Sequence, residues 1–142
     1  MKKNFTKIRV IYADTDAMGI VYHTNYIRWF EIGRNELFRD MGMVYADMEA
    51  AGYQLPLTKV FCHYLQPARY DQVLEVETWI DCLRRASIRF EYVIWDETRQ
   101  NRLVEGYTVH ACTNREGRVR RFPAFLLEKV TPFYPLNSSD PS

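Results

Sequence analysis

A short segment near the N-terminus places two carboxylates, a glycine and a histidine directly before a helical pattern. It reads DTDAMGIVYH over residues 14–23. A carboxylate in such a loop can act as a nucleophile or as a general base for water. The free N–H groups in the first turn of the following helix carry partial positive charge, so they can stabilise the oxyanion that forms at an attacked thioester or ester carbonyl. The segment is therefore a candidate site for acyl transfer or hydrolysis.

The same residues also have a purely structural interpretation. Asp14 and Asp16 are residue types that commonly form turns and caps, and Gly19 suits a turn that needs a positive φ. Of the two carboxylates, we expect Asp14 to bind local backbone N–H groups, because an Asp near a turn usually does so. Residue types alone leave the catalytic and the structural interpretations open.

The elements on either side must position this segment. Residues 5–12 are rich in β-forming side chains and predict a strand. The spacing then becomes helical over residues 24–41, with an end signal at Gly42. One apolar face of this helix is formed by Tyr26, Phe30, Gly33, Leu37 and Met41. Apolar residues flank that face, so we expect the helix to be covered on more than one side.

Most of the remaining chain alternates as β-strands do. Four such runs cover residues 57–65, 74–82, 86–94 and 103–113, and a short helix is expected over 124–129. The glutamates in the run 74–82 predict a strand with one face in water. The connections are short and polar, as in antiparallel hairpins. One long helix wrapped on one side by a five-stranded antiparallel sheet is an α+β fold, whose outer face must meet solvent or another subunit.

Length and composition restrict the classes of protein. The 142 residues, 47% hydrophobic and 26% charged, make one globular domain, expected over residues 1–132 with a flexible polar tail over 133–142. The net charge of +1 removes the usual electrostatic reason to expect nucleic acid. No apolar stretch is long enough for a membrane span. Aromatic residues make up 15% of the chain, which suits an oligomer interface as well as a core.

The cysteines and histidines give no sign of a metal or a disulfide framework. The three cysteines have no paired spacing, which favours a reducing cytoplasm, and no cofactor or metal is expected. His110 and Cys112 share a strand face, and we interpret them as a core pair rather than a nucleophile with its base.

Two further groups of charged residues have both functional and structural interpretations. Arg34 falls inside the apolar band of the helix, where Glu31 is the nearest candidate partner. Glu31 either lines the site or has a structural role, in which it pairs with Arg34 or Arg34 extends its charged end to solvent. Arginines also surround the turn at Gly117, Arg118 and Arg120 among them. They suit a clamp for phosphates, and equally a solvated hairpin end.

The stretch IYADTDAMGIVYHTNYIRWFEIGRNEL, residues 11–37, resembles the 4-hydroxybenzoyl-CoA thioesterase-like branch of the hotdog-fold superfamily. It is most similar to the small acyl-CoA thioesterases of the Tol-Pal-associated type. The specific part is DTDAMGIVYH followed by Asn25, Tyr26, Glu31 and Arg34, while the later strands match only in pattern. Met18 stands where many relatives have a smaller residue, so the resemblance does not identify the acyl group.

The resemblance implies a fold, a reaction and an assembly. A hotdog domain pairs through sheet edges into a homodimer, often assembled further into a homotetramer. The reaction is hydrolysis of an acyl-CoA thioester, with Asp16 as the catalytic carboxylate and the backbone N–H of His23 directed at the thioester oxygen. Gly19, Tyr26, Glu31, Arg118 and Arg120 are the candidate substrate-binding residues. For the two arginines, the prediction is contact with the CoA phosphates.

Two other functions stay open at this point. A hotdog hydratase acting on enoyl thioesters would bring its His and acidic residue closer together, whereas Asp16 and His23 are seven positions apart. A non-catalytic acyl-CoA-binding module would keep the fold, although the intact Asp16 argues against it.

Overall fold

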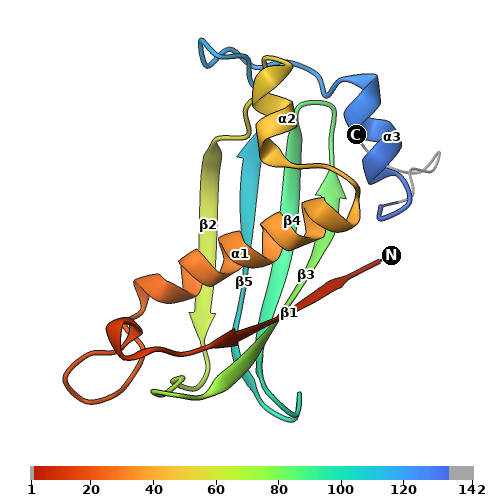
Figure 1. The fold of residues 1–142 in the computed structure, drawn as a ribbon. Coiled ribbons are helices and arrows are strands. Elements are labelled where there is room, and N and C mark those ends of the chain that lie inside the picture. Colours follow the sequence, from red (N-terminus) through yellow and green to blue (C-terminus); the bar gives the residue numbers. More distant parts are fainter. Residues whose placement is uncertain (1, 135–142) are drawn as a thin grey trace.

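The structure, a computed structural model, describes residues 2–134. A five-stranded antiparallel sheet curves around one long helix (Figure 1). The strands occur along the sheet in the order β1-β3-β4-β5-β2, so β1 and β2 are its edges. Their bounds are β1 Asn4–Arg9, β2 Leu57–Tyr64, β3 Val73–Leu83, β4 Ser87–Asp96 and β5 Arg102–Ala111. Both the α+β class and the antiparallel pairing expected from the sequence are confirmed.

Helix α1, Thr24–Asp40, crosses the concave face of the sheet and agrees closely with the predicted helix (Figure 1). It is followed by Gly42, whose φ of 75° needs a glycine. Helices α2, Tyr45–Ala50, and α3, Ala124–Val130, lie beyond the end of the sheet where β5 finishes. The sequence indicated α3 but not α2, because six residues are too few for a helical period to be recognised.

The first strand is shorter than predicted. It ends at Arg9, and residues Tyr12–Asp14 form a 3-10 turn, η1, instead of the end of a strand. The Asp14 carboxylate accepts a hydrogen bond from the backbone N–H of Ile11 at 3.0 Å. That local side-chain contact competes with strand pairing and turns the chain towards the DTD segment.

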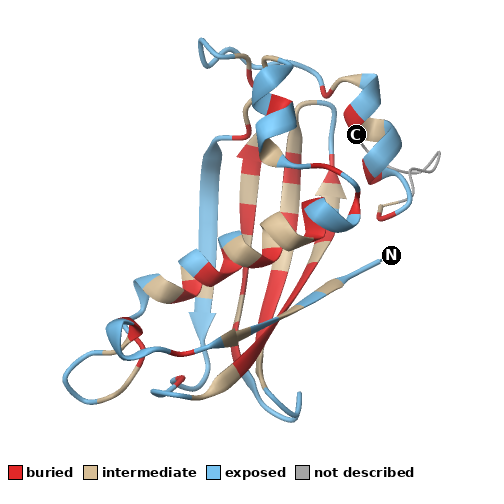
Figure 2. Cartoon of the chain, viewed as in Figure 1, coloured by how far each residue is buried: buried red, intermediate tan, exposed pale blue. Residues whose placement is uncertain are grey.

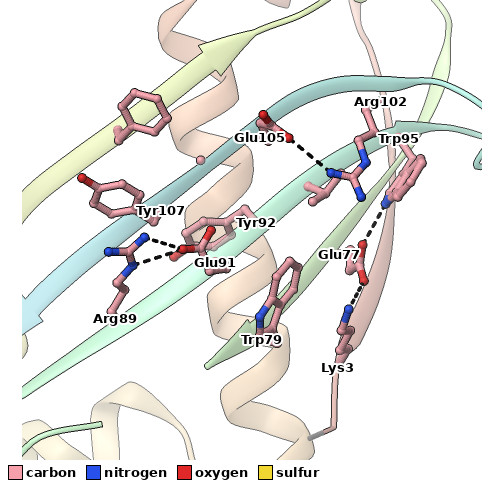
Figure 3. A pocket seen from close by; sticks show the side chains of 13 residues that line it. Lys3, Glu77, Trp79, Arg89, Glu91, Tyr92, Trp95, Arg102, Glu105 and Tyr107 are labelled. Atoms are coloured by element: carbon pink, nitrogen blue, oxygen red, sulfur yellow. Dashed lines mark hydrogen bonds and ion pairs between the residues drawn. The ribbon is translucent and has the colours of Figure 1, made fainter. Parts of the chain in front are cut away.

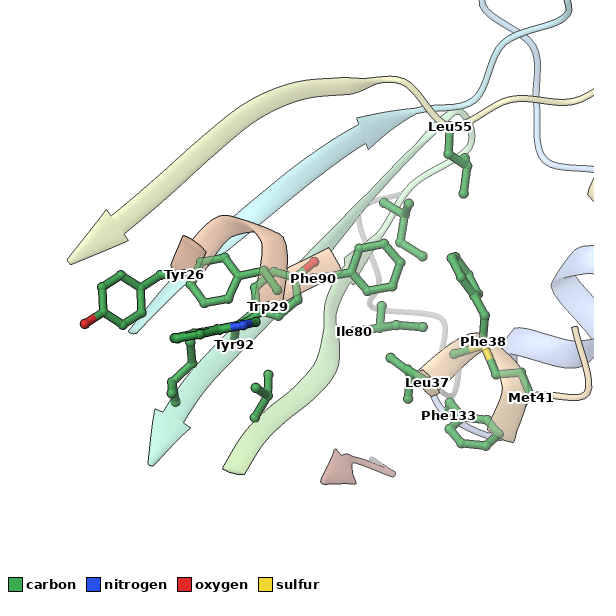
Figure 4. Close-up of a cluster of buried hydrophobic side chains, with 14 of the residues drawn as sticks. Tyr26, Trp29, Leu37, Phe38, Met41, Leu55, Ile80, Phe90, Tyr92 and Phe133 are labelled. Atoms are coloured by element: carbon green, nitrogen blue, oxygen red, sulfur yellow. The ribbon is translucent and has the colours of Figure 1, made fainter. Parts of the chain in front are cut away.

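The core lies between α1 and the inner face of the sheet (Figures 2 and 4). Phe30 of α1 stacks on Tyr92 of β4 with ring centroids 4.3 Å apart, and Phe38 meets Phe90 edge to face. Phe133 also belongs to this cluster, only 9% exposed, and Tyr134 packs against it. The domain therefore extends past position 132 and includes the first two residues assigned to the tail; residues 135–142 lie outside the described chain.

Two glycines set the distance between helix and sheet. A Cβ on Gly33 of α1 would overlap the Thr78 hydroxyl and the Val76 side chain of β3. A Cβ on Gly106 of β5 would overlap the Phe61 carbonyl oxygen and press on the Phe30 ring. Close packing in protein interiors leaves no room for such atoms, so these positions determine how deeply α1 lies in the sheet.

The outer face of β3 differs from the water-facing surface that its glutamates predicted. Glu75 and Glu77 are only 5% and 8% exposed. Glu77 accepts hydrogen bonds from Lys3 at 2.7 Å and from the indole of Trp95 at 2.9 Å, while Arg99 pairs with Glu75. The apolar stems of Lys3 and Arg99 cover these carboxylates, and the cationic ends balance the negative charge. An alternating sequence pattern cannot indicate such a cover.

We predict that Gly33→Ala destabilises the protein although alanine is the better helix former. The gain in helix propensity is at most about 1 kcal/mol, whereas forcing a methyl into a filled core costs about 1–3 kcal/mol. Urea unfolding should therefore show a net loss of stability. Arg39→Ala, at an exposed position of the same helix, should change stability by less than about 0.5 kcal/mol. Equal stability of Gly33→Ala and the parent would contradict this account of the packing.

Candidate active site

The DTD segment forms a tight hairpin rather than an open loop. Thr15 and Val21 form a β-bridge, and the backbone N–H of Asp16 donates to the Ile20 carbonyl at 2.9 Å. Gly19 occupies the tip region with a φ of 75°, a conformation that disfavours any other residue. Val21 donates to the Ala68 carbonyl at 2.9 Å, so the hairpin is held against the segment that follows β2. A carboxylate on this hairpin has a fixed position.

The Asp16 side chain is exposed, and only one of its two carboxylate oxygens accepts hydrogen bonds. Its Oδ1 accepts hydrogen bonds from the backbone N–H groups of Met18 at 2.8 Å and Ile20 at 3.3 Å. Its Oδ2 has no hydrogen-bond partner within residues 2–134. The two backbone donors fix the orientation of the carboxylate and leave one oxygen available for a water or a carbonyl carbon.

Asp14 has the structural role expected of it. It is 4% exposed, and its Oδ1 pairs with Arg28 of α1 at 2.6 Å while Oδ2 accepts from Ile11. Its carbonyl also receives the side-chain amide of Asn25 and the backbone N–H of Tyr22, both at 2.9 Å. All these contacts tie the hairpin to the start of α1.

The start of α1 offers free backbone donors next to this hairpin. His23 is the N-cap, its side chain is exposed, and its carbonyl is held by Tyr26 and by the Tyr64 hydroxyl. The N–H groups of His23 and Thr24 donate to no group in the described part of the chain. Such donors at a helix N-terminus suit an oxyanion. They are 7 and 8 positions after Asp16, joined to it through the hairpin.

Tyr26 differs in placement from the other candidate residues. It is 3% exposed, and its hydroxyl accepts the backbone N–H of Ala68 at 2.9 Å. Burial raises the pKa of this hydroxyl. Tyr26 thus anchors the segment on which the hairpin rests, and a contact with substrate stays a prediction. Met18, by contrast, is 78% exposed near the tip of the hairpin.

The predicted phosphate-binding arginines are not beside Asp16 within one chain. Arg118 and Arg120 follow β5, in a turn closed by the bridge between Thr113 and Val119. The hairpin between β1 and α1, which carries Asp16, lies at the opposite end of the sheet, near the end of β2 (Figure 1). The eight residues of β2 separate the two ends by about 25 Å. Both arginine side chains are exposed and form no salt bridge in residues 2–134.

Glu31 and Arg34 both line a cavity on the inner side of the domain, and they form no ion pair with each other. The cavity, of about 260 Å³, lies between α1, α2 and the start of β2. The Arg34 guanidinium donates to the Tyr92 hydroxyl at 3.4 Å instead of pairing with Glu31. Of the interpretations that the sequence left open, the ion pair does not form, because a buried hydroxyl on the sheet lies within reach of Arg34.

Behind Arg34 runs a buried row of polar groups that the sequence analysis did not identify. The Tyr92 hydroxyl is 2.7 Å from Thr108 Oγ1, which is 3.0 Å from His110 Nε2. His110 Nδ1 is 3.0 Å from the Leu55 carbonyl oxygen. The sequence does contain one sign of this row. Polar residues stand at inward positions of β4 and β5, where the other inward positions are mostly apolar.

His110 and Cys112 do not form a nucleophilic pair. Burial and the positive charge of Arg34 lower the pKa of His110 from 6.5 to about 4, so its ring is neutral near pH 7. Burial raises the pKa of the Cys112 thiol to about 11. A thiol of that pKa is a poor nucleophile, so the core interpretation of both residues holds. No cluster of metal-binding side chains occurs in residues 2–134.

A hollow of about 500 Å³ lies on the outer face of the sheet, away from α1 (Figure 3). Its charged side chains largely pair with one another, as Arg89 does with Glu91 at 2.6 Å and Arg102 with Glu105 at 3.3 Å. The Arg89 guanidinium also lies 3.8 Å from the centre of the Tyr107 ring. Because the hairpin and the helix start belong to other parts of the domain, this hollow is not the candidate active site.

Comparisons with known proteins identify relatives of this chain. Residues 10–130 match the family model described as the thioesterase-like superfamily. A Bacillus subtilis (strain 168) protein named "Putative acyl-CoA thioesterase YneP" is 36% identical over 110 residues, 78% of this chain and 79% of that protein. Acyl-CoA thioester hydrolase YbgC of Escherichia coli O6:H1 is 36% identical over 83 residues, 58% of this chain and 62% of that protein.

A crystal structure of a hypothetical protein from Thermus thermophilus superposes with a TM-score of 0.87 at 30% identity, covering 96% of this chain and 100% of that one. The architecture is the hotdog fold that the sequence resemblance implied. No helix in residues 2–134 is both long and apolar enough to cross a membrane.

We predict that the neutral state of His110 makes stability depend on pH. The folded pKa of about 4 lies below the ordinary value of 6.5, so the unfolded chain binds the proton first as the pH falls. The contribution of neutral His110 to the free energy of unfolding is complete above pH 6.5 and is lost progressively towards pH 4. Between pH 7 and pH 5 the loss is about 2 kcal/mol. Urea unfolding of the parent and of His110→Gln at both pH values measures it. Parallel stability profiles of the two proteins would show that His110 titrates normally.

Proposed function

The chain belongs to the thioesterase-like superfamily, and from this membership we propose that it hydrolyses acyl-CoA thioesters to a free carboxylic acid and CoA. The observation that carries the proposal is Asp16, an exposed carboxylate with one free oxygen on a rigid hairpin that leads into the free N–H groups of a helix start. The relatives' names support acyl-CoA as the substrate class.

The chemistry follows from these two features. In one route, Asp16 takes a proton from water as the water oxygen bonds to the thioester carbonyl carbon. The carbonyl oxygen becomes an oxyanion, stabilised by the N–H groups of His23 and Thr24. The C–S bond then breaks, and the CoA thiolate leaves and is protonated. In the other route, Asp16 attacks the carbonyl carbon itself, and water hydrolyses the resulting anhydride.

The alternatives from other classes are less well supported. An enoyl-thioester hydratase needs a base close to the acyl α- and β-carbons, whereas His110, the buried histidine, is enclosed by Thr108, Leu55 and Phe90. A non-catalytic binding module would have no use for an oriented carboxylate beside free helix donors. Three unpaired cysteines suit a reducing compartment, so we propose a cytoplasmic location, where CoA thioesters are made and used.

We further propose that the complete site forms between two copies of the chain. Strand β2 is an edge with exposed side chains along it, the apolar Leu57, Val60, Phe61 and Tyr64 among them (Figure 2). An exposed apolar edge is a template for another strand. A second copy that pairs antiparallel along β2 about a twofold axis places the Leu57 end of one strand beside the Tyr64 end of the other.

This pairing would bring the Asp16 hairpin of one copy close to the Arg118 and Arg120 turn of the other. Tyr64 contacts His23, so the Asp16 hairpin of one copy would lie beside the Leu57 end of its partner. The Arg118 and Arg120 turn belongs to that end, which would bring the partner's arginines to the CoA phosphates. The outer face carries charges of both signs, Arg89, Glu91, Arg102 and Glu105 among them, which suits a second, self-complementary contact in a tetramer.

We predict that Asp16→Asn lowers kcat for acyl-CoA hydrolysis by about 10² or more, with KM little changed, because the shape is kept and the base is lost. Asp14→Asn is the matched control. It should lower the melting temperature, since it weakens the pair with Arg28, and reduce kcat of the folded enzyme far less. Thiol release from a panel of acyl-CoAs measures both. A dead Asp14→Asn with an active Asp16→Asn would reverse the assignments.

Isotope labelling separates the two chemical routes. Under single-turnover conditions in heavy-oxygen water, an anhydride intermediate puts label into the Asp16 carboxylate. Direct attack by water puts label into the product acid alone. Turnover of no acyl-CoA by the parent protein would contradict the proposed function and favour the binding module.

We predict complementation between a variant without the catalytic carboxylate and a variant with weakened CoA binding if the site forms between copies. A hybrid of Asp16→Asn with the double variant Arg118→Ala, Arg120→Ala would contain one site with both defects and one with none. Refolding the two variants together should therefore recover activity well above the average of the separate preparations. Sedimentation at micromolar concentration should show a dimer or tetramer. A monomer, or an activity equal to that average, would contradict assembly of the site between chains.

A further inference from the structure

The inner cavity, between α1, α2 and the start of β2, has apolar walls and one polar side. Phe38, Tyr45 and Leu55 give it apolar walls, while Arg34, Asn35 and Glu31 add polar groups from one side of α1. Its volume of about 260 Å³ is near the lower limit for small-molecule pockets and suits a short acyl group. Leu55 lies two residues before β2, so the cavity belongs to the Leu57 end of the edge strand.

The hydrogen bonds in the row of polar groups behind the cavity all run in the same donor-to-acceptor direction. The Leu55 carbonyl can only accept, so His110 Nδ1 carries the proton, and the neutral ring then accepts at Nε2. Thr108 therefore donates to His110, and the Tyr92 hydroxyl donates to Thr108. This leaves the Tyr92 oxygen as an acceptor for Arg34. Every donor in the row points away from Arg34, and the row holds its guanidinium at the cavity wall.

Arg34 differs from Arg89, the other half-buried arginine in residues 2–134. Arg89 forms salt bridges with Glu91 and Asp81. Arg34 is half-buried, and within residues 2–134 its only polar contact is the neutral Tyr92 hydroxyl. A guanidinium has five N–H donors and remains charged, so most of its binding capacity is unused. Glu31 lines the same cavity, but the two side chains form no salt bridge in residues 2–134, so the guanidinium can bind a carboxylate of a ligand.

We propose that Arg34 is a specificity-determining residue that binds an anionic oxygen of the substrate, namely a carboxylate at the far end of the acyl group. The inference rests on the proposed function and on the pairing along β2. In that assembly the cavity of one copy lies next to the Asp16 hairpin of the other, so a short acyl chain reaches from the reacting carbonyl towards Arg34. The apolar walls contact its methylene groups, and the guanidinium binds the terminal carboxylate through two parallel hydrogen bonds.

Adipyl-CoA and hexanoyl-CoA are a matched pair of substrates, with equal chain length and a carboxylate or a methyl at the end. We expect the parent enzyme to favour adipyl-CoA in kcat/KM by roughly tenfold or more, as a hydrogen-bonded charge pair implies. Arg34→Met should remove this preference, and Arg34→Lys should restore part of it. Arg39→Met is the control, because Arg39 is exposed on the same helix and pairs with Glu36.

The fold should tolerate Arg34→Met, since Tyr92 keeps its own donation to Thr108. Binding of free adipate and hexanoate to the parent protein, followed by calorimetry, tests the site without any variant and without turnover. Tighter binding of adipate supports the proposal, even if no acyl-CoA is hydrolysed. Equal binding of the two acids overturns it. A loss of kcat/KM in Arg34→Met that is equal for both CoA esters, with weaker inhibition by CoA, assigns Arg34 to the CoA phosphates and also overturns it.

Discussion

The close approach of α1 to the sheet is the constraint on which the rest of the structure depends. Gly33 and Gly106 remove the two side chains that would hold the layers apart, so Phe30 reaches the sheet and stacks on Tyr92. A helix this deep in a concave sheet has little freedom to shift along its axis. Its first turn, with the free N–H groups of His23 and Thr24, is therefore fixed relative to the sheet and to the segment after β2 that holds the Asp16 hairpin.

The same packing encloses a polar row inside an otherwise apolar core. Unpaired polar groups in such a place would be costly, but Tyr92, Thr108 and His110 satisfy one another in a single direction. The row ends at the Leu55 carbonyl on one side and at Arg34 on the other. It links the middle of α1 to the start of β2, and it keeps His110 neutral. His110 therefore does not act as a base here. Its neutral ring accepts a hydrogen bond in the row that orients the Arg34 guanidinium.

The candidate chemistry is divided between the two ends of the domain. The hairpin carrying Asp16 and the start of α1 lie at one end of β2, while the inner cavity and the Arg118 turn belong to the other. No bending of a packed sheet brings ends about 25 Å apart together. The second copy proposed to pair antiparallel along the exposed edge would do so without any change within the chain. In this view, the exposure of β2 and the distribution of functional groups have one common explanation.

The sequence by itself determined the elements and the local chemistry. Helical spacing predicted α1 nearly to the residue, alternation indicated the four long strands, and turn chemistry indicated the structural role of Asp14. The catalytic role of Asp16 rests on the family resemblance and stays a proposal. Tertiary structure decided what depends on distant neighbours: the burial of Glu75 and Glu77 beneath Lys3 and Arg99, the choice of Tyr92 over Glu31 as partner of Arg34, and the distance between Asp16 and the arginine turn. The physical reason is that period and propensity act within a few residues, whereas the partner of a buried charge is set by which strands the fold brings beside it.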